Sequence, residues 1–213
     1  MPDSVTDSGV WRPLERSIRW LTRRLAIHEN VNYGHDFRVG RSVVISSAHK
    51  LMIGDWVSVG PRSIIQTSGE IGDFCLIGMG VQIVGRDDHR ISEVGSPVSM
   101  STWIGERELE SRDSVIIGRD VWVGGGSTIL SGVRIGDGAI IGSASVVTKD
   151  IPPFAIAVGN PARVVAMRFD EHEHTLMHLR ALDALAAARR SQAHESGHRF
   201  KSWISRQAAS RRT

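Results

Sequence analysis

The chain is poor in cysteine, in aromatic residues and in long apolar runs, and each scarcity excludes a class of protein. A single cysteine permits no internal disulfide, so a reducing, cytoplasmic location is expected. No apolar run approaches the ~20 residues that cross a membrane, and the first ten residues lack the apolar stretch of a signal peptide. Because only 6% of the residues are aromatic, aliphatic side chains must build the core.

An excess of one charge is also missing, since the formal net charge is only +3 over 213 residues. The basic residues gather near both ends of the chain, whereas the central part is mildly acidic. A nucleic-acid-binding domain should present clustered basic residues on its folded body. We therefore expect no nucleic-acid partner.

A strict six-residue period dominates the sequence. The aliphatic residues that keep this period form two blocks, with a weaker echo at Val39 and Ile45: Ile53, Val59, Ile65, Ile71, Ile77 and Ile83, then Ile117, Val123, Ile129, Ile135, Ile141 and Val147. Neither the 3.6-residue period of a helix nor the alternation of an ordinary strand fits this spacing. Period six instead predicts a parallel β-helix, in which each buried aliphatic side chain contributes roughly 1.5–3 kcal/mol.

Small or apolar residues stand four positions after each aliphatic residue, and we expect them to point inward near the corners. Cys75 holds one of these positions and is therefore interpreted as a core residue, not a nucleophile. Glycine follows the aliphatic residue in most repeats, and we attribute this to corners that need φ > 0. The run GGGS at 124–127 is interpreted in the same way, because a dinucleotide-binding loop would lead from a strand into a helix.

The run IGRDVWVGGGSTILSGVRIGDGAIIGSASVVTKDIPPFAIAVGNPARVV, from Ile117 to Val165, resembles the hexapeptide-repeat acyltransferases. Its ending, VVTKDIPPFAIAVGNPARVV, is typical of members that use acetyl-CoA. The resemblance covers residues 30–170 and implies a left-handed parallel β-helix. We expect a mainly β protein with about five coils, one long protruding loop at 84–116 and helices at both ends. The expected divisions are an N-terminal arm (1–30), the β-helix (31–169), a C-terminal helix (170–190) and a disordered basic tail (191–213).

The period is interrupted between Ile83 and Ile117, and a long excursion from a rigid scaffold is usually functional. In similar acetyltransferases a histidine at the start of such a loop is the catalytic base, and His89 in DDHR matches it. A neutral imidazole is suited to take a proton from the acceptor near pH 7. Asp87 or Asp88 is expected to hold the other ring nitrogen. The xenobiotic branch of the family usually carries Asn at the position of Asp88. This difference bears on which class of acceptor the protein uses, and not on the assignment of the base.

The resemblance also implies a site for acetyl-CoA as acyl donor. The positions that match CoA-binding residues are Trp122, Gly125, Ser143, Thr148, Lys149 and Arg163. The indole is expected beside the pantetheine arm, the next three residues offer backbone or hydroxyl hydrogen bonds, and the two cations are expected near the phosphates. A backbone N–H near Gly125 is the expected oxyanion donor. The family is typically trimeric, with sites between subunits, so we expect a homotrimer.

The expected function is acetyl-CoA-dependent transfer of an acetyl group to a hydroxyl or amine of a sugar, sugar nucleotide or glycan, by direct attack with His89 as general base. Two alternatives stay open: a xenobiotic (antibiotic) O-acetyltransferase, and a non-catalytic β-helix that binds or scaffolds. No metal is expected, because a zinc enzyme on this fold needs three converging histidines. His174 and His178 are interpreted as a solvated helix face.

The segment WRPLERSIRWLTRRLA predicts an amphipathic helix near the N-terminus, with Leu14, Ile18, Leu21 and Leu25 on one face and arginines on the rest. Two interpretations remain open. The helix caps the first coil, because solenoid ends must be covered, or its arginines and tryptophans make weak contact with an anionic membrane surface.

Overall fold

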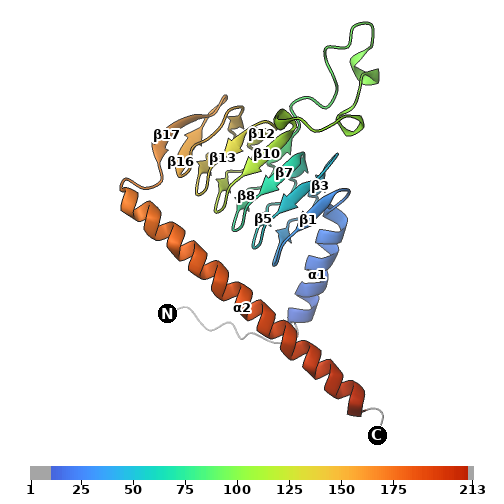
Figure 1. Cartoon of the computed structure of the whole chain (residues 1–213), viewed down its shortest axis with the longest axis vertical. Helices are drawn as coiled ribbons and strands as arrows, with labels where there is room; N and C mark the ends of the chain where they lie inside the picture. Colours follow the sequence, from blue (N-terminus) through green and yellow to red (C-terminus); the bar gives the residue numbers. More distant parts are fainter. Residues whose placement is uncertain (1–10, 211–213) are drawn as a thin grey trace. The chain divides into compact units, whose positions relative to one another are not determined.

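The computed structural model describes the backbone of residues 11–210 and the side chains of residues 18–192. The chain divides into two units, Met1–Arg168 and Phe169–Thr213, and each is described by itself. The first unit winds into a β-solenoid of about six turns with three sheets (Figure 1). The predicted parallel β-helix is therefore confirmed, although the solenoid has one turn more than the five coils expected.

The three faces of the solenoid are built from short strands stacked turn upon turn. The first face contains β1 (Val31–Tyr33), β4 (Leu51–Ile53), β7 (Ser68–Ile71), β10 (Ser114–Ile117) and β13 (Arg134–Ile135). The second contains β2 (Arg38–Val39), β5 (Ser58–Val59), β8 (Leu76–Ile77), β11 (Trp122–Val123), β14 (Ile140–Ile141), β16 (Ala155–Val158) and β17 (Arg163–Met167). The third contains β3 (Val44–Ser46), β6 (Ile64–Gln66), β9 (Gln82–Val84), β12 (Thr128–Leu130) and β15 (Val146–Val147). The strand pairs are parallel, except that β17 runs antiparallel to β16.

The aliphatic residues of the six-residue period form the core, as predicted. From Ile53 to Val147 each is at most 4% exposed. The first turn buries Ile45, one of the two residues of the weaker echo, and the last turn buries Ala157 in register with Ile141. The expected small inward residues are buried too, and the Ser127 hydroxyl donates to the Gly142 carbonyl at 2.9 Å.

The single cysteine belongs to this core. Cys75 is 1% exposed, and its thiol donates to the Gly118 carbonyl at 3.1 Å. Burial raises the pKa of the Cys75 thiol to about 12. A thiolate is therefore absent near pH 7, and Cys75 is no nucleophile.

The glycines that follow the aliphatic residues are needed for a different reason from the predicted one. Gly54, Gly72 and Gly124 do not have positive φ; a Cβ on Gly124 would lie 2.5 Å from the Ser143 nitrogen of the next turn. Stacked turns approach so closely there that only glycine fits. Positive φ occurs two residues later, often at non-glycine residues such as Trp56, with φ 56°.

The N-terminal helix α1 (Trp11–Ala26) contacts the first turn at β2 and β3. Ala26 is buried at this contact, and the Arg23 guanidinium donates to the Phe37 carbonyl at 3.4 Å. The same guanidinium lies 5.4 Å from the centroid of the Tyr33 ring. The solenoid end is thus contacted by a small residue and an arginine.

The predicted apolar face of α1 stays largely exposed. Ile18, Leu21 and Leu25 are 51%, 50% and 67% exposed, while Leu14 falls outside the described side chains. The predicted contact of α1 with the first coil is present, and Ala26 and Arg23 take part in it. Sequence periodicity identifies an apolar face but not the neighbour that covers it.

The second unit contains one long helix, α2 (His172–Ser210). The structure continues α2 past residue 190, where the sequence analysis ends this helix, through a segment that contains no proline. Among the described residues, no helix combines the length and the apolar composition needed to cross a lipid bilayer.

Candidate active site

The long loop leaves the solenoid after β9, on the third face, and returns at β10, on the first face (Figure 1). It spans residues 85–113, slightly less than the predicted 84–116. Three short 3₁₀ turns lie within it: η1 (Val98–Met100), η2 (Ile104–Glu106) and η3 (Ser111–Asp113). The loop is therefore an ordered structure attached at the corner between the third and first faces.

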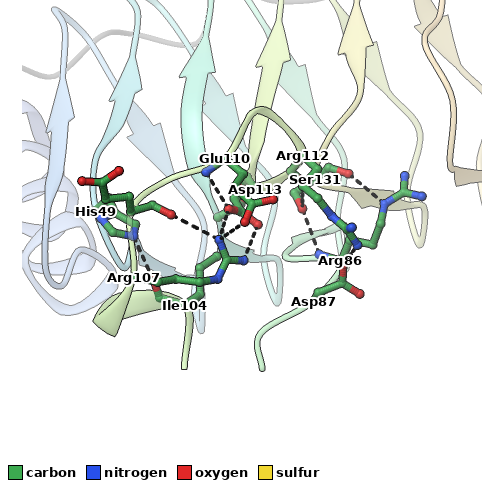
Figure 2. A network of polar contacts seen from close by, with 11 residues as sticks. His49, Arg86, Asp87, Ile104, Arg107, Glu110, Arg112, Asp113 and Ser131 are labelled. Carbon is green, nitrogen blue, oxygen red and sulfur yellow. Dashed lines mark hydrogen bonds and ion pairs between the residues drawn. The ribbon is translucent and has the colours of Figure 1, made fainter. Parts of the chain in front are cut away.

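A buried ion pair holds the returning limb of the loop (Figure 2). Both guanidinium nitrogens of Arg107 donate to the Asp113 carboxylate, at 2.6 and 2.8 Å, and the Glu110 N–H donates to it at 2.8 Å. Burial alone would raise the pKa of Asp113, but these hydrogen bonds outweigh it and lower the pKa. His49 adds a second tie, since its Nε2 donates to the Ile104 carbonyl at 2.9 Å.

The departing limb is tied to the third face. The Arg86 N–H donates to the Ser131 hydroxyl at 2.9 Å, and the Arg86 guanidinium donates to the Thr148 carbonyl at 3.0 Å. Asp87 forms an ion pair with Arg112 of the returning limb (Figure 2). The two limbs are thus clamped to each other and to the solenoid where the catalytic histidine is expected.

His89 is half-buried just beyond this clamp, and its Nδ1 lies 3.0 Å from the Ser101 carbonyl oxygen. A carbonyl oxygen only accepts hydrogen bonds, so Nδ1 carries the proton and Nε2 of the neutral ring is left as an acceptor. The prediction that Asp87 or Asp88 holds the ring is therefore wrong. The carbonyl twelve residues away takes that role, while Asp87 is committed to Arg112.

A shallow cavity of about 400 Å³ lies beside His89. Asp87, Arg90, Arg107 and Arg112 are among the residues that line it. Trp103 lies directly opposite His89 in a short antiparallel bridge, and its indole is 45% exposed. The N–H of Ile104 donates to the Asp88 carbonyl, and the N–H of Arg90 to the Thr102 carbonyl. His89 and Trp103 are thus a non-hydrogen-bonded pair, whose side chains approach each other most closely.

The predicted CoA-binding residues fall into two groups on the solenoid. Trp122 lies on β11 of the second face and is 51% exposed. Gly125 and Ser143 stack at the next corner, where the Ala144 N–H donates to the Gly125 carbonyl at 2.9 Å. Arg163 is exposed on β17 of the same face. The second face and its corner thus gather four of the six residues.

Gly125 has the property expected of an oxyanion donor. The N–H groups of Gly124 and Gly126 donate to the carbonyls of Ile141 and Met79, at 2.7 and 2.9 Å. Within the part of the chain that the structure describes, the N–H of Gly125 has no hydrogen-bond acceptor. This corner therefore offers a backbone donor to a ligand.

Thr148 and Lys149 lie at a different corner, after β15, and Thr148 meets the loop through Arg86. The strand β12 runs from the corner of Gly125 to the corner where the loop leaves. Within one chain, His89 and Gly125 therefore belong to opposite sides of the third face. In the structure, Gly125 lies beside Ser143 at one corner, and the loop contacts Thr148 at another. The residues predicted for catalysis and CoA binding therefore do not all lie together within one chain.

Models of two protein families match parts of this solenoid. A model described as bacterial transferase hexapeptide (six repeats) matches residues 114–149, and one for the hexapeptide repeat of succinyl-transferase matches residues 50–84. Both models describe hexapeptide repeats, and together they match two separate parts of the solenoid.

Relatives of this hexapeptide-repeat protein include a chloramphenicol acetyltransferase from Agrobacterium fabrum, 39% identical over 50% of this chain and 55% of the relative. A probable macrolide acetyltransferase from Lysinibacillus sphaericus is 37% identical over 48% of this chain and 62% of the relative. The chain thus spans little more than half the length of these curated relatives. The N-acyltransferase AntD from Bacillus cereus, solved with dTDP and 3-hydroxybutyryl-CoA, shares the fold, with a TM-score of 0.57, 19% identity and coverage of 76% of this chain and 85% of AntD.

Several residues that organise the site escaped the sequence analysis. Ser101, His49 and the Arg107–Asp113 pair carry no motif, because each acts on a group distant in the sequence or through its backbone. No cluster of three or more potential metal ligands occurs among the described residues. His174 is exposed on α2, with its Nε2 3.8 Å from the Glu171 carboxylate.

Proposed function

We propose that this hexapeptide-repeat protein is an acetyl-CoA-dependent acetyltransferase in which His89 is the general base. The observation that carries the proposal is the contact of His89 Nδ1 with the Ser101 carbonyl at 3.0 Å. It leaves Nε2 as the unprotonated nitrogen, which general-base catalysis requires. The match to the bacterial transferase hexapeptide model and the names of the relatives support acetyl transfer as the reaction.

The reaction needs only groups that the chain presents. His89 Nε2 takes the proton of an acceptor hydroxyl or amine as the acceptor attacks the thioester carbonyl. The C–S bond then breaks, the acetyl group remains on the acceptor, and the thiolate of CoA leaves with the proton from the imidazolium. The free N–H of Gly125 suits the oxyanion that develops. No covalent enzyme intermediate is needed.

For the acyl donor, the second face offers the matched residues in suitable positions. Trp122 presents an exposed indole, Ser143 is exposed beside Gly125, and Arg163 supplies a cation on β17. Lys149 is exposed beyond β15. The indole fits the apolar part of CoA, the Ser143 hydroxyl fits its polar part, and the two cations fit its phosphates. Thr148 directs its carbonyl to Arg86 and so also serves the loop.

The relatives favour the xenobiotic alternative over the sugar acceptor predicted first. Those reported above are named for chloramphenicol and macrolides, and AntD, solved with a nucleotide, is alike only in fold. We therefore propose a hydroxyl of a small xenobiotic as the acceptor. Asp88, where that branch usually has Asn, is the residue that sets this protein apart. An acceptor panel with chloramphenicol, erythromycin, sugars and sugar nucleotides separates the two assignments.

The separation of His89 from Gly125 across the third face supports a site shared between subunits. Because one chain presents the base at one corner and the oxyanion donor at another, we propose that the loop of one subunit meets the Gly125 corner of the next in a homotrimer. Mixing inactive His89→Ala and Gly125→Pro subunits should restore activity, since some seams then carry both intact halves. Absence of any restored activity in mixed trimers would contradict a shared site.

The base assignment is tested by thiol release from acetyl-CoA. His89→Ala should lower turnover by about a hundredfold or more, with the KM for acetyl-CoA preserved. His28→Ala is the matched control, because His28 is exposed near α1 and away from the loop. Near-normal turnover of His89→Ala would refute the assignment. A wild-type protein that binds CoA without turnover on any acceptor would instead favour the non-catalytic scaffold.

A further inference from the structure

The helix α1 presents an apolar stripe that nothing in the described chain covers. Ile18, Leu21 and Leu25 recur at helical spacing and are half or more exposed. The indole of Trp20 is 59% exposed on the same helix. The face that contacts the solenoid is formed by Ala26 and Arg23 instead. The apolar stripe is therefore free to contact another surface.

The charge of α1 indicates which surface this is. Its sequence, WRPLERSIRWLTRRLA, holds five arginines and one acidic residue. Arg19 and Arg24 are exposed, and Arg23 and Arg24 stand in the last turn. Helices with an arginine-rich polar face and leucines on the apolar face lie in the interface of anionic bilayers.

We propose that α1 binds the surface of an anionic lipid bilayer through Ile18, Leu21 and Leu25, with the exposed side chains of Arg19 and Arg24 near the headgroups. The helix lies in the plane of the interface and does not span it. This surface is separate from the loop and from the Gly125 corner, so the proposal does not depend on the acetyl-transfer reaction. Its consequence is that the protein works at a membrane surface and not in bulk solution.

Vesicle flotation of the full chain tests the proposal. The probes are vesicles of phosphatidylcholine with about 30% phosphatidylglycerol and vesicles of phosphatidylcholine alone. The wild type should float with the anionic vesicles, and raising salt from about 50 to 300 mM should weaken binding because it screens the arginines. Leu21→Asp and the double variant Arg19→Glu/Arg24→Glu should each weaken binding at least tenfold.

Two matched controls keep the test specific. Val165→Asp places the same charge on another exposed apolar residue, and Arg134→Glu reverses an exposed arginine on β13. Both should float like the wild type, and melting temperatures should confirm that every variant is folded. Equal flotation of all variants, no flotation of the wild type, or equal binding to neutral vesicles would overturn the proposal. A further result would also overturn it: the wild type does not bind vesicles, and Leu21→Asp has a smaller oligomeric mass than the wild type. That result would assign the stripe to contact with a second copy of the chain.

Discussion

Replacing Arg107 by alanine should release the loop at residues 85–113 while leaving the solenoid folded. The change removes two hydrogen bonds, at 2.6 and 2.8 Å, from a carboxylate that is 2% exposed. Breaking a buried pair by deleting one partner costs roughly 3–5 kcal/mol. Arg107 itself keeps 12% of its side-chain surface exposed. We therefore expect about 3 kcal/mol, the lower end of that range, because water can reach the orphaned Asp113.

The loss should be local, because each turn of a solenoid contacts only its neighbours. A reduction of about 3 kcal/mol in the free energy of loop opening corresponds to exchange about a hundredfold faster at the protected loop amides, since about 1.4 kcal/mol is a factor of ten. Hydrogen exchange read by mass spectrometry on peptides from 85–113 measures this rate. Peptides from β11 to β14 should exchange as in the wild type.

The control is Arg38→Ala, which removes an ion pair with Asp36 whose side chains are 53% and 40% exposed. Such surface pairs contribute about 0–1 kcal/mol, so its exchange pattern should stay close to that of the wild type. If Arg107→Ala changes loop exchange no more than Arg38→Ala does, the reasoning about the buried pair is wrong.

The same pair predicts how the loop responds to acid. The pKa of Asp113 is lowered in the folded protein, so its stabilising contribution is fully present above the unfolded value, near 3.8, and is lost as pH falls through the lowered folded value. Loop protection should therefore be constant above about pH 5 and decline below about pH 4. In Arg107→Ala this acid dependence should be reduced or reversed, because desolvation then dominates the pKa of Asp113.

The remaining predictions concern single positions. Gly124→Ala should lower stability by about 1–3 kcal/mol, because its Cβ would overlap the Ser143 nitrogen of the next turn; Ala144→Gly, at φ 57°, should be neutral or stabilising in the same thermal melts. Arg163→Glu should raise the KM for acetyl-CoA and leave that for the acceptor nearly unchanged; the opposite pattern would remove Arg163 from the donor site. Trp103→Ala should raise the acceptor KM about tenfold and spare that of acetyl-CoA, whereas equal effects on both would indicate a merely structural indole.

The candidate site shows where reasoning from the sequence reached its limit. His89 was predicted as the base because it stands at the break in a regular period, where similar acetyltransferases carry a histidine. Its true partner was missed because the Ser101 carbonyl is a backbone group, and every residue has one. The free N–H of Gly125 is likewise a backbone group. It is identified only in the structure, where the N–H groups of both neighbouring residues donate to carbonyls of adjacent turns.

The sequence by itself determined the solenoid, because an aliphatic residue recurs every six residues and gives each side of each turn the same buried position. Burial of this aliphatic column is the main favourable contribution to the free energy of folding. Only the tertiary structure decided the rest. It showed that close contact between turns requires the glycines and that a buried ion pair holds the loop. It also showed that α1 contacts the solenoid through Ala26 and leaves Leu21 and Leu25 exposed. These outcomes depend on contacts between residues distant in the chain, which no local period encodes.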